Sequence, residues 1–326
     1  MQIAFRPKLL DCLPTYNRAQ FGKDLASGIT VGVLALPLAM AFAIASGCSP
    51  TAGIWTAIVA GFITAAFGGS RVQIGGPTGA FIPIVYGIVA VQGFGNLMGA
   101  TMLAGIFLLA MGLARMGQLI RFIPLTVVIG FTNGIAVVIF LAQIKDFFGL
   151  QIESLPAEFF ARIKVLAANA HTVDWPTLAL AVCCFLFLLS YNRLALRISL
   201  LRRAPGPLAV LVVGTLVSYF FELPVETIGS RFNGIPQELP NFGLPAVSIH
   251  DIGKLISPAI TIALLGAIES LLSARVADGQ IDDRHDPNQE LVAQGLSNIA
   301  APLFGGFAAT GAIARTTTNV KTGGRT

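Results

Sequence analysis

The chain has 326 residues, of which 55% are hydrophobic and 11% charged, and its formal net charge is +5 at pH 7. A chain this apolar cannot present a water-facing surface in all directions, so the composition excludes a soluble globular protein and predicts an integral membrane protein. The positive charge is expected to reflect membrane topology, and nucleic-acid binding is not expected.

Charge-free apolar runs predict the membrane segments, because a spanning helix needs roughly 20 apolar residues. The runs 25–70 and 72–114 are each divided by a turn rich in Gly, with Pro in the first. The predicted segments are 25–46, 52–69, 79–93, 97–115, 122–144, 175–194, 206–222, 255–277, 290–304 and 313–324. The third and tenth are too short to cross a ~30 Å hydrocarbon core as helices alone, so each crossing is expected to contain a broken helix.

The loops indicate the orientation. Residues 193–203 carry four arginines and no acid, whereas 222–254 carry four acids and two bases. Placing the amino terminus inside therefore satisfies the positive-inside rule. We expect a multi-pass protein of the plasma (inner) membrane, in contact with the lipid bilayer, whose N-terminus is cytoplasmic and is not a cleaved signal peptide. Residues 156–168 place apolar side chains at helical spacing, with Arg162 among the polar positions, which predicts an interfacial helix on the outer side.

Two similar Gly-rich motifs precede the two short segments. Residues 75–80 read Gly-Gly-Pro-Thr-Gly-Ala, and residues 305–312 also contain a Gly pair followed by Thr-Gly-Ala. Interrupted segments at corresponding places in two halves of a membrane protein are typical of a transporter's substrate site. Helices that begin near Ala80 and Ile313 would direct unpaired N–H groups and positive dipole ends toward mid-membrane. This arrangement predicts an anion site.

Other side chains near the two helix starts have matching chemistry. Gly79 and Gly311 allow a ligand to approach the backbone closely. Thr78 and Thr316 would add hydroxyl donors, and Arg315 would add a full positive charge. Close helix packing by small residues is the alternative interpretation of a single Gly-rich motif. The matched pair with an intramembrane arginine favours a binding site.

Glu269 is the other charge inside an apolar segment, and Ser273 lies one helical turn further on the same face. We expect this face to be directed toward Arg315 and Thr316. Two interpretations remain open: a static ion pair between Glu269 and Arg315, or a carboxylate that takes a proton or borders a cation during transport.

The sequence contains no motif for several other functions. The four cysteines and three histidines show no metal-ligand spacing. There is no Walker-type phosphate loop and no nucleophile elbow with triad partners. We therefore expect no enzyme activity, no cofactor and no metal.

Taken together, these motifs resemble the sulfate permease family of anion transporters. The resemblance rests on residues 36–43 (Leu-Pro-Leu-Ala-Met-Ala-Phe-Ala), on 76–79, on Asn-Gln-Glu-Leu at 288–291, and on the 310–318 tract. It implies an all-α inverted-repeat fold of fourteen segments, seven in each repeat, with a core domain and a gate domain. Homodimers and a following STAS domain are also implied.

Mapped onto this chain, the resemblance implies the following domains: a cytoplasmic segment 1–24, core 25–116, gate 117–222, an outer loop 223–254 and further core 255–326. The second repeat would be incomplete, with about ten segments in all. We therefore expect a fragment of a longer transporter that does not transport by itself.

The resemblance places the anion site between the third and tenth helices. The implied substrate-binding residues are Phe42, Thr78, Gly79, Ala80, Phe81, Ala314, Arg315 and Thr316. Leu38 stands where many members carry a polar or acidic residue, which leaves Glu269, with Ser273, as the expected site of the coupling ion.

The expected function is elevator-type secondary active transport of a small anion. A sulfate-like ion is favoured as substrate, with H⁺ rather than Na⁺ as the coupling ion. A C4-dicarboxylate carrier or a sodium-coupled bicarbonate transporter is the first alternative. An anion channel or a non-transporting sensor is the alternative from another class.

Overall fold

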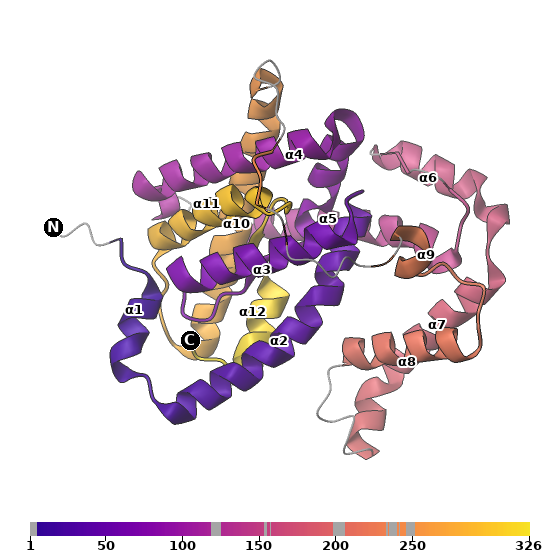
Figure 1. Ribbon diagram of the computed structural model, residues 1–326, viewed down its shortest axis with the longest axis horizontal. Helices are drawn as coiled ribbons and strands as arrows, with labels where there is room; N and C mark the ends of the chain where they lie inside the picture. Colours follow the sequence, from indigo (N-terminus) through magenta and orange to yellow (C-terminus); the bar gives the residue numbers. More distant parts are fainter. Residues whose placement is uncertain are drawn as a thin grey trace. The chain divides into compact units, whose positions relative to one another are not determined.

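The computed structural model describes residues 5–118, 125–152, 155–156, 158–197, 206–232, 234, 240, 242–245 and 252–326. Apart from two strands of two residues each, its elements are helical (Figure 1). They are α1 (Lys8–Cys12), α2 (Arg18–Ala45), α3 (Pro50–Phe67), β1 (Gly75–Gly76), α4 (Ile82–Leu113), α5 (Leu125–Phe148), α6 (Phe159–Ala168), α7 (Trp175–Arg197), α8 (Gly206–Phe220), α9 (Ile228–Phe232), α10 (Ile252–Ile281), α11 (Pro287–Leu303), β2 (Thr310–Gly311) and α12 (Ile313–Lys321). Single 3₁₀ turns occupy Leu13–Thr15, Gly79–Phe81 and Ala170–Thr172.

Within the described residues, four helices are long and apolar enough to cross a membrane. They are Arg18–Ala45, Pro50–Phe67, Gly79–Leu113 and Ile252–Ile281. Shorter apolar helices cover 175–191 and 206–220. Large apolar side chains such as Phe62 and Val91 are 72% and 82% exposed, as expected for helices that face lipid rather than water.

The helix bounds agree closely with the predicted segments, with one clear difference at α2. This helix begins at Arg18 rather than at residue 25, because the Asn17 side chain caps it by accepting a hydrogen bond from Gln20 N (2.9 Å). The predicted cytoplasmic segment 1–24 therefore contains the first turns of the spanning helix. Residues 122–124 of the predicted fifth segment and much of the predicted outer loop lie outside the described residues.

The chain divides into two compact units, 1–133 with 236–326, and 134–235. In the first unit α10 packs against α4, α11, α12 and β2 (Figure 1). Small residues let the helices approach closely: a Cβ on Gly53 of α3 would lie 2.2 Å from the Ala39 carbonyl oxygen of α2. A Cβ on Gly105 of α4 would lie 2.7 Å from the Gly295 carbonyl oxygen of α11.

The predicted break within the second apolar run is present. Gly93 has φ +80° and ψ 169° inside α4, which separates the helix into two parts at the predicted boundary. Only glycine adopts this backbone conformation without strain. The first part of α4, and α12 with its nine residues, are the two short helices that follow the Gly-rich motifs.

The second unit contains α6, α7, α8, α9 and most of α5. A helix is present where the interfacial helix was expected, as α6. Phe160 is 68% exposed, whereas Arg162 is buried and its Nε donates to Pro156 O (3.0 Å). The Pro156 carbonyl accepts this hydrogen bond, so the Nε–H donor of the buried guanidinium is paired.

Candidate functional site

The two Gly-rich motifs meet in space. β1 and β2 pair antiparallel, with Gly75 opposite Gly311 and Gly76 opposite Thr310. Ala312 N extends the pairing by donating to Ile74 O (2.9 Å). Backbone hydrogen bonds therefore join residues that are more than 200 positions apart in the sequence, and both strands lead directly into short helices.

Both helix starts leave donors unused. Their N-cap residues, Thr78 and Ala312, are extended, and neither caps its helix with a side-chain hydrogen bond. The N–H groups of the first turn have no carbonyl partner within a helix, and the aligned peptide dipoles make each start partly positive. The arrangement has the features of a helix-terminus anion site formed by two helices instead of one.

Arg315 connects the two motifs. Its side chain extends from α12 to the residue after β1, where Nη2 donates to Pro77 O, and it is only 4% exposed. A Cβ on Gly76 would lie 2.7 Å from Arg315 Nη1, and Gly76 has φ +142°, so both the space and the backbone conformation require glycine here. Arg315 Nε is buried and has no hydrogen-bond partner. A buried donor of this kind is costly unless a ligand occupies it.

Glu269 bonds to the first motif and not to the arginine. Thr78 Oγ1 donates to Glu269 Oε2 at 3.0 Å. Among the described residues, the ion pairs within 4.0 Å do not include Glu269 with Arg315. The direct ion pair that was one of the two interpretations of the sequence is therefore not formed in this structure. The half-buried carboxylate instead holds the hydroxyl at the start of the α4 half-helix.

Ser273 and Thr316 meet as the shared helix face predicts. Ser273 Oγ donates to Thr316 Oγ1 (3.3 Å), and Ile74 N donates to the same oxygen (3.0 Å). Thr316 Oγ1 accepts both of these hydrogen bonds, so they position the side chain without using its own O–H donor.

The remaining predicted residues occupy different surroundings. Phe81 is 1% exposed, and its ring packs toward Gly266 of α10 in the hydrophobic core. Gly79 and Ala80 are half-buried in the 3₁₀ turn, and Ala314 is exposed. Phe42 is half-buried one turn before the end of α2, and the described contacts do not join it to the other residues. No cluster of potential metal ligands occurs in the described part of the chain.

Glu290 supports the site but was not predicted as a functional residue. It is fully buried and accepts four hydrogen bonds: Oε2 from Gly69 N (2.9 Å) and Ser70 N (3.3 Å), and Oε1 from Gln73 Nε2 (3.0 Å) and Gln294 Nε2 (2.9 Å). It thereby anchors the loop that precedes β1. In the sequence Glu290 is an acidic residue at the start of an apolar segment. It entered the prediction only as part of the Asn-Gln-Glu-Leu motif at 288–291.

Gln73 extends this support to β2. Its Nε2 also donates to Ser270 O (3.0 Å), and a Cβ on Gly311 would lie 2.0 Å from the same nitrogen. Ser270 Oγ in turn accepts from Gly311 N (3.0 Å) and contacts Thr310 Oγ1 (2.6 Å). Buried polar groups from α10 and α11 therefore hold both strands, and so both helix starts, in position.

Comparison with known proteins identifies relatives of this arrangement. The model of the sulfate permease family matches residues 21–326. The chain is 45% identical over 309 residues to the putative sulfate transporter YvdB of Bacillus subtilis, covering 94% of the chain and 57% of that protein. It is 30% identical over 316 residues to the bicarbonate transporter BicA of Picosynechococcus, covering 93% and 54%.

Solved structures share the fold. The transmembrane domain of a cyanobacterial bicarbonate transporter BicA gives a TM-score of 0.83 at 31% identity, covering 95% of this chain and 80% of that chain. The murine Slc26a9 anion transporter in the inward-facing state gives 0.84 at 20% identity, covering 97% and 56%. The prediction of an all-α inverted-repeat membrane fold is confirmed, with the two-residue strands as its only addition among the described residues. The chain spans little more than half the length of these curated relatives.

Proposed function

The chain belongs to the sulfate permease family, and from this premise we propose that it forms the anion-binding part of a secondary active transporter. The main support is the buried, unpartnered Nε of Arg315 beside two uncapped helix starts that β1 and β2 hold together. These groups are all donors or positive dipole ends, so they match an anion and offer no nucleophile or base for an enzymatic reaction.

The substrate we propose is a small oxyanion bound by the N–H groups near Gly79, Ala80 and Ala314 and by Arg315. A sulfate-like ion is favoured because the 45% identical relative is named a putative sulfate transporter. Bicarbonate is the second candidate, supported by the BicA relatives at 30–32% identity. Phe42 and Thr316 would border the ligand, and Phe81 would support the site from the core.

We further propose that Glu269 couples transport to protons, with Ser273 as its neighbour on α10. An ionised Glu269 bonded to Thr78 places a negative charge beside the partly positive α4 start, which weakens anion binding. Protonation would remove this charge and free the Thr78 hydroxyl. The proton and the anion would then bind with positive coupling, as symport requires.

The proposal includes movement of one unit relative to another. All the proposed site residues belong to the unit formed by 1–133 and 236–326, and none to 134–235. This separation supports an elevator in which a core domain carries the site past a gate domain. We propose that the full-length protein works as a homodimer in the plasma membrane with its N-terminus in the cytoplasm.

The test uses the full-length protein in proteoliposomes with an inward-directed proton gradient. Wild-type protein is expected to accumulate sulfate, and Glu269→Gln is expected to lose accumulation while still binding the anion, because glutamine resembles the protonated acid but cannot release a proton. Glu158→Gln, an exposed acid outside the site, is the matched control. Accumulation by Glu269→Gln with an unchanged pH dependence would refute the coupling.

Competition and turnover distinguish the alternatives. Sulfate, bicarbonate, fumarate and chloride are compared as competitors of uptake at two pH values. Competition by bicarbonate or fumarate would support the alternative substrates. A dependence of uptake on Na⁺ would support the alternative coupling ion. A channel would pass ions far faster and could not accumulate them, and a sensor would bind without uptake. Either result would overturn secondary active transport while leaving anion binding intact.

A further inference from the structure

A cationic pocket lies away from the proposed anion site. Its volume is about 390 Å³, and Lys23, Arg71 and Arg325 line it together with the polar side chains of Asn17 and Gln20. Its walls come from the start of α2, the loop after α3, the end of α10 and the residues after α12. Among the described residues, no acidic side chain lines it. The positive dipole end of α2 adds to its potential.

Two of the three cations have no partner among the described residues. Within the described residues, Lys23 Nζ and the Arg325 guanidinium take part in no hydrogen bond or ion pair. Arg71 is only partly engaged, with Nε 3.2 Å from Cys12 Sγ and 3.7 Å from Asp283 Oδ2. Lys23 and Arg325 are exposed, so their side chains are free to bind an anion in the pocket through charge-assisted hydrogen bonds.

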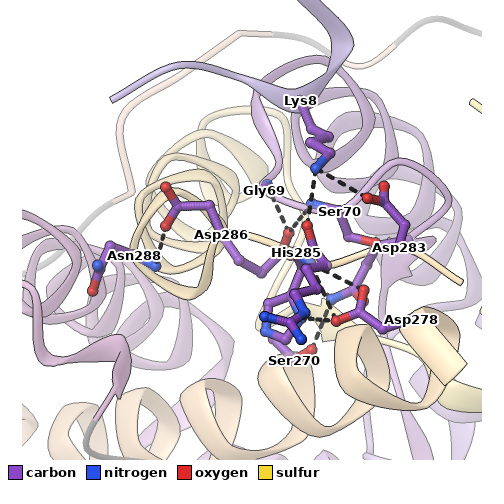
Figure 2. Close-up of polar contacts among 12 residues, drawn as sticks. Lys8, Gly69, Ser70, Ser270, Asp278, Asp283, His285, Asp286 and Asn288 are labelled. Carbon is purple, nitrogen blue, oxygen red and sulfur yellow. Dashed lines mark hydrogen bonds and ion pairs between the residues drawn. The ribbon is translucent and has the colours of Figure 1, made fainter. Parts of the chain in front are cut away.

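The neighbouring acids are already occupied. Asp24 accepts from the backbone N of Arg325 (2.6 Å), which holds this residue at the pocket, and from Tyr16 Oη (2.9 Å). Figure 2 shows Lys8 reaching Asp283 (3.3 Å) and His285 directed at Asp278 (2.6 Å). Asp24 keeps its negative charge, because these donors are neutral, and Asp283 offsets part of the charge on Arg71. The three lining cations still outnumber these two adjacent acids, and Asp283 is shared with Lys8.

The pocket lies at the level of the membrane surface. Lys23 is separated by one residue from the start of the charge-free run 25–70, and Arg71 follows its end directly. The two cations thus mark the same end of the α2–α3 hairpin, where it leaves the hydrocarbon. On another face of α2, Phe21 and Leu25 are 54% and 51% exposed and would lie against lipid tails.

We propose that this pocket binds a phosphate group, and that its source is the head group of an anionic phospholipid. Basic pockets between membrane helices at the surface are suited to such head groups. The volume exceeds what a single inorganic oxyanion needs, and the adjacent exposed apolar face of α2 favours lipid over free phosphate. The bound head group would tie together α2, α10 and the end of α12, the helices that carry Phe42, Glu269 and Arg315.

The test is thermal unfolding of the full-length protein in detergent, titrated with short-chain phosphatidylglycerol, short-chain phosphatidylcholine or inorganic phosphate. Phosphatidylglycerol is expected to raise the melting temperature saturably, and phosphatidylcholine is not. In Lys23→Gln/Arg325→Gln the apparent affinity for phosphatidylglycerol should fall at least about tenfold. Arg18→Gln/Lys164→Gln, which removes two exposed charges outside the pocket, should retain the full shift.

Three results would overturn the proposal. The first is an equal phosphatidylglycerol shift in the pocket variant and the wild type. The second is a loss of the shift in the control variant as well, which would indicate general charge attraction. The third is the same saturable shift with inorganic phosphate, which would assign the pocket to soluble phosphate. If the double variant does not fold, Lys23→Gln alone gives the same readout, because Lys23 makes no protein contact that folding needs.

Discussion

Glu290→Gln tests whether the buried carboxylate holds the loop before β1. The substitution keeps the size and shape of the side chain but replaces one acceptor oxygen with an NH₂ donor. All four groups that bond to Glu290 are donors, two on each oxygen. In one orientation the new NH₂ group faces the two backbone N–H donors, which cannot turn away. In the other it faces the Gln73 and Gln294 amides; Gln294 can turn its unpartnered Oε1 toward it, but Gln73 is held by Ser270 O, so at least one donor loses its acceptor.

The magnitude follows from this count. Each buried donor left without an acceptor costs about 1–3 kcal/mol, so the free energy of unfolding should fall by at least about 1–3 kcal/mol. Gln294→Ala leaves three of the four bonds to the carboxylate in place and should cost less. Because the loop 69–74 leads into β1, sulfate binding by Glu290→Gln should weaken as well.

The assay is reversible unfolding of the full-length protein in mixed micelles of mild detergent and sodium dodecyl sulfate, followed by tryptophan fluorescence. Glu158→Gln provides a control for removal of an exposed carboxylate and should leave the unfolding curve unchanged. A Glu290→Gln protein as stable as the wild type would refute the reasoning, because it would show that the side chain need not act as an acceptor at both oxygens.

Three further predictions concern single residues. Gly311→Ala should reduce sulfate uptake at least about tenfold, because its Cβ would lie 2.0 Å from Gln73 Nε2, whereas Gly279→Ala, with open space around it, should not. Arg315→Gln should weaken sulfate binding at least about tenfold in equilibrium dialysis, and an unchanged Kd would remove this residue from the site. Burial raises the pKa of the Cys48 thiol to about 12, so a maleimide should label it at pH 8 only after denaturation; labelling of the folded protein at that pH would contradict this.

Much of the helical architecture could be predicted from local sequence. The observed bounds of α3, α7 and α8 lie within three residues of the predicted segments, and Gly93 breaks α4 where the Gly-rich turn was expected. The prediction was least accurate at the start of α2, because a helix continues into water when its end is capped. Apolar runs report where hydrocarbon begins, not where hydrogen bonding along a helix ends.

The candidate site was predicted as a set of residues but not as a network. The sequence identified Arg315, Glu269 and Thr78 because charges and Gly-rich motifs are exceptional inside apolar runs. It suggested that Arg315 and Glu269 could form a pair, whereas the structure places Arg315 on Pro77 and Glu269 on Thr78. Glu290, at the edge of its apolar run, did not stand out although it bonds to more groups than either.

The sequence by itself determined the class of protein, the positions of its membrane segments and the two broken helices. These properties follow from transfer of side chains out of water and from backbone preferences of glycine, both of which act over about 20 residues or fewer. Only the tertiary structure decided the partners of each polar group. Several of these partners lie more than 200 residues away in the sequence. Small rotations between packed helices determine which donors face which acceptors.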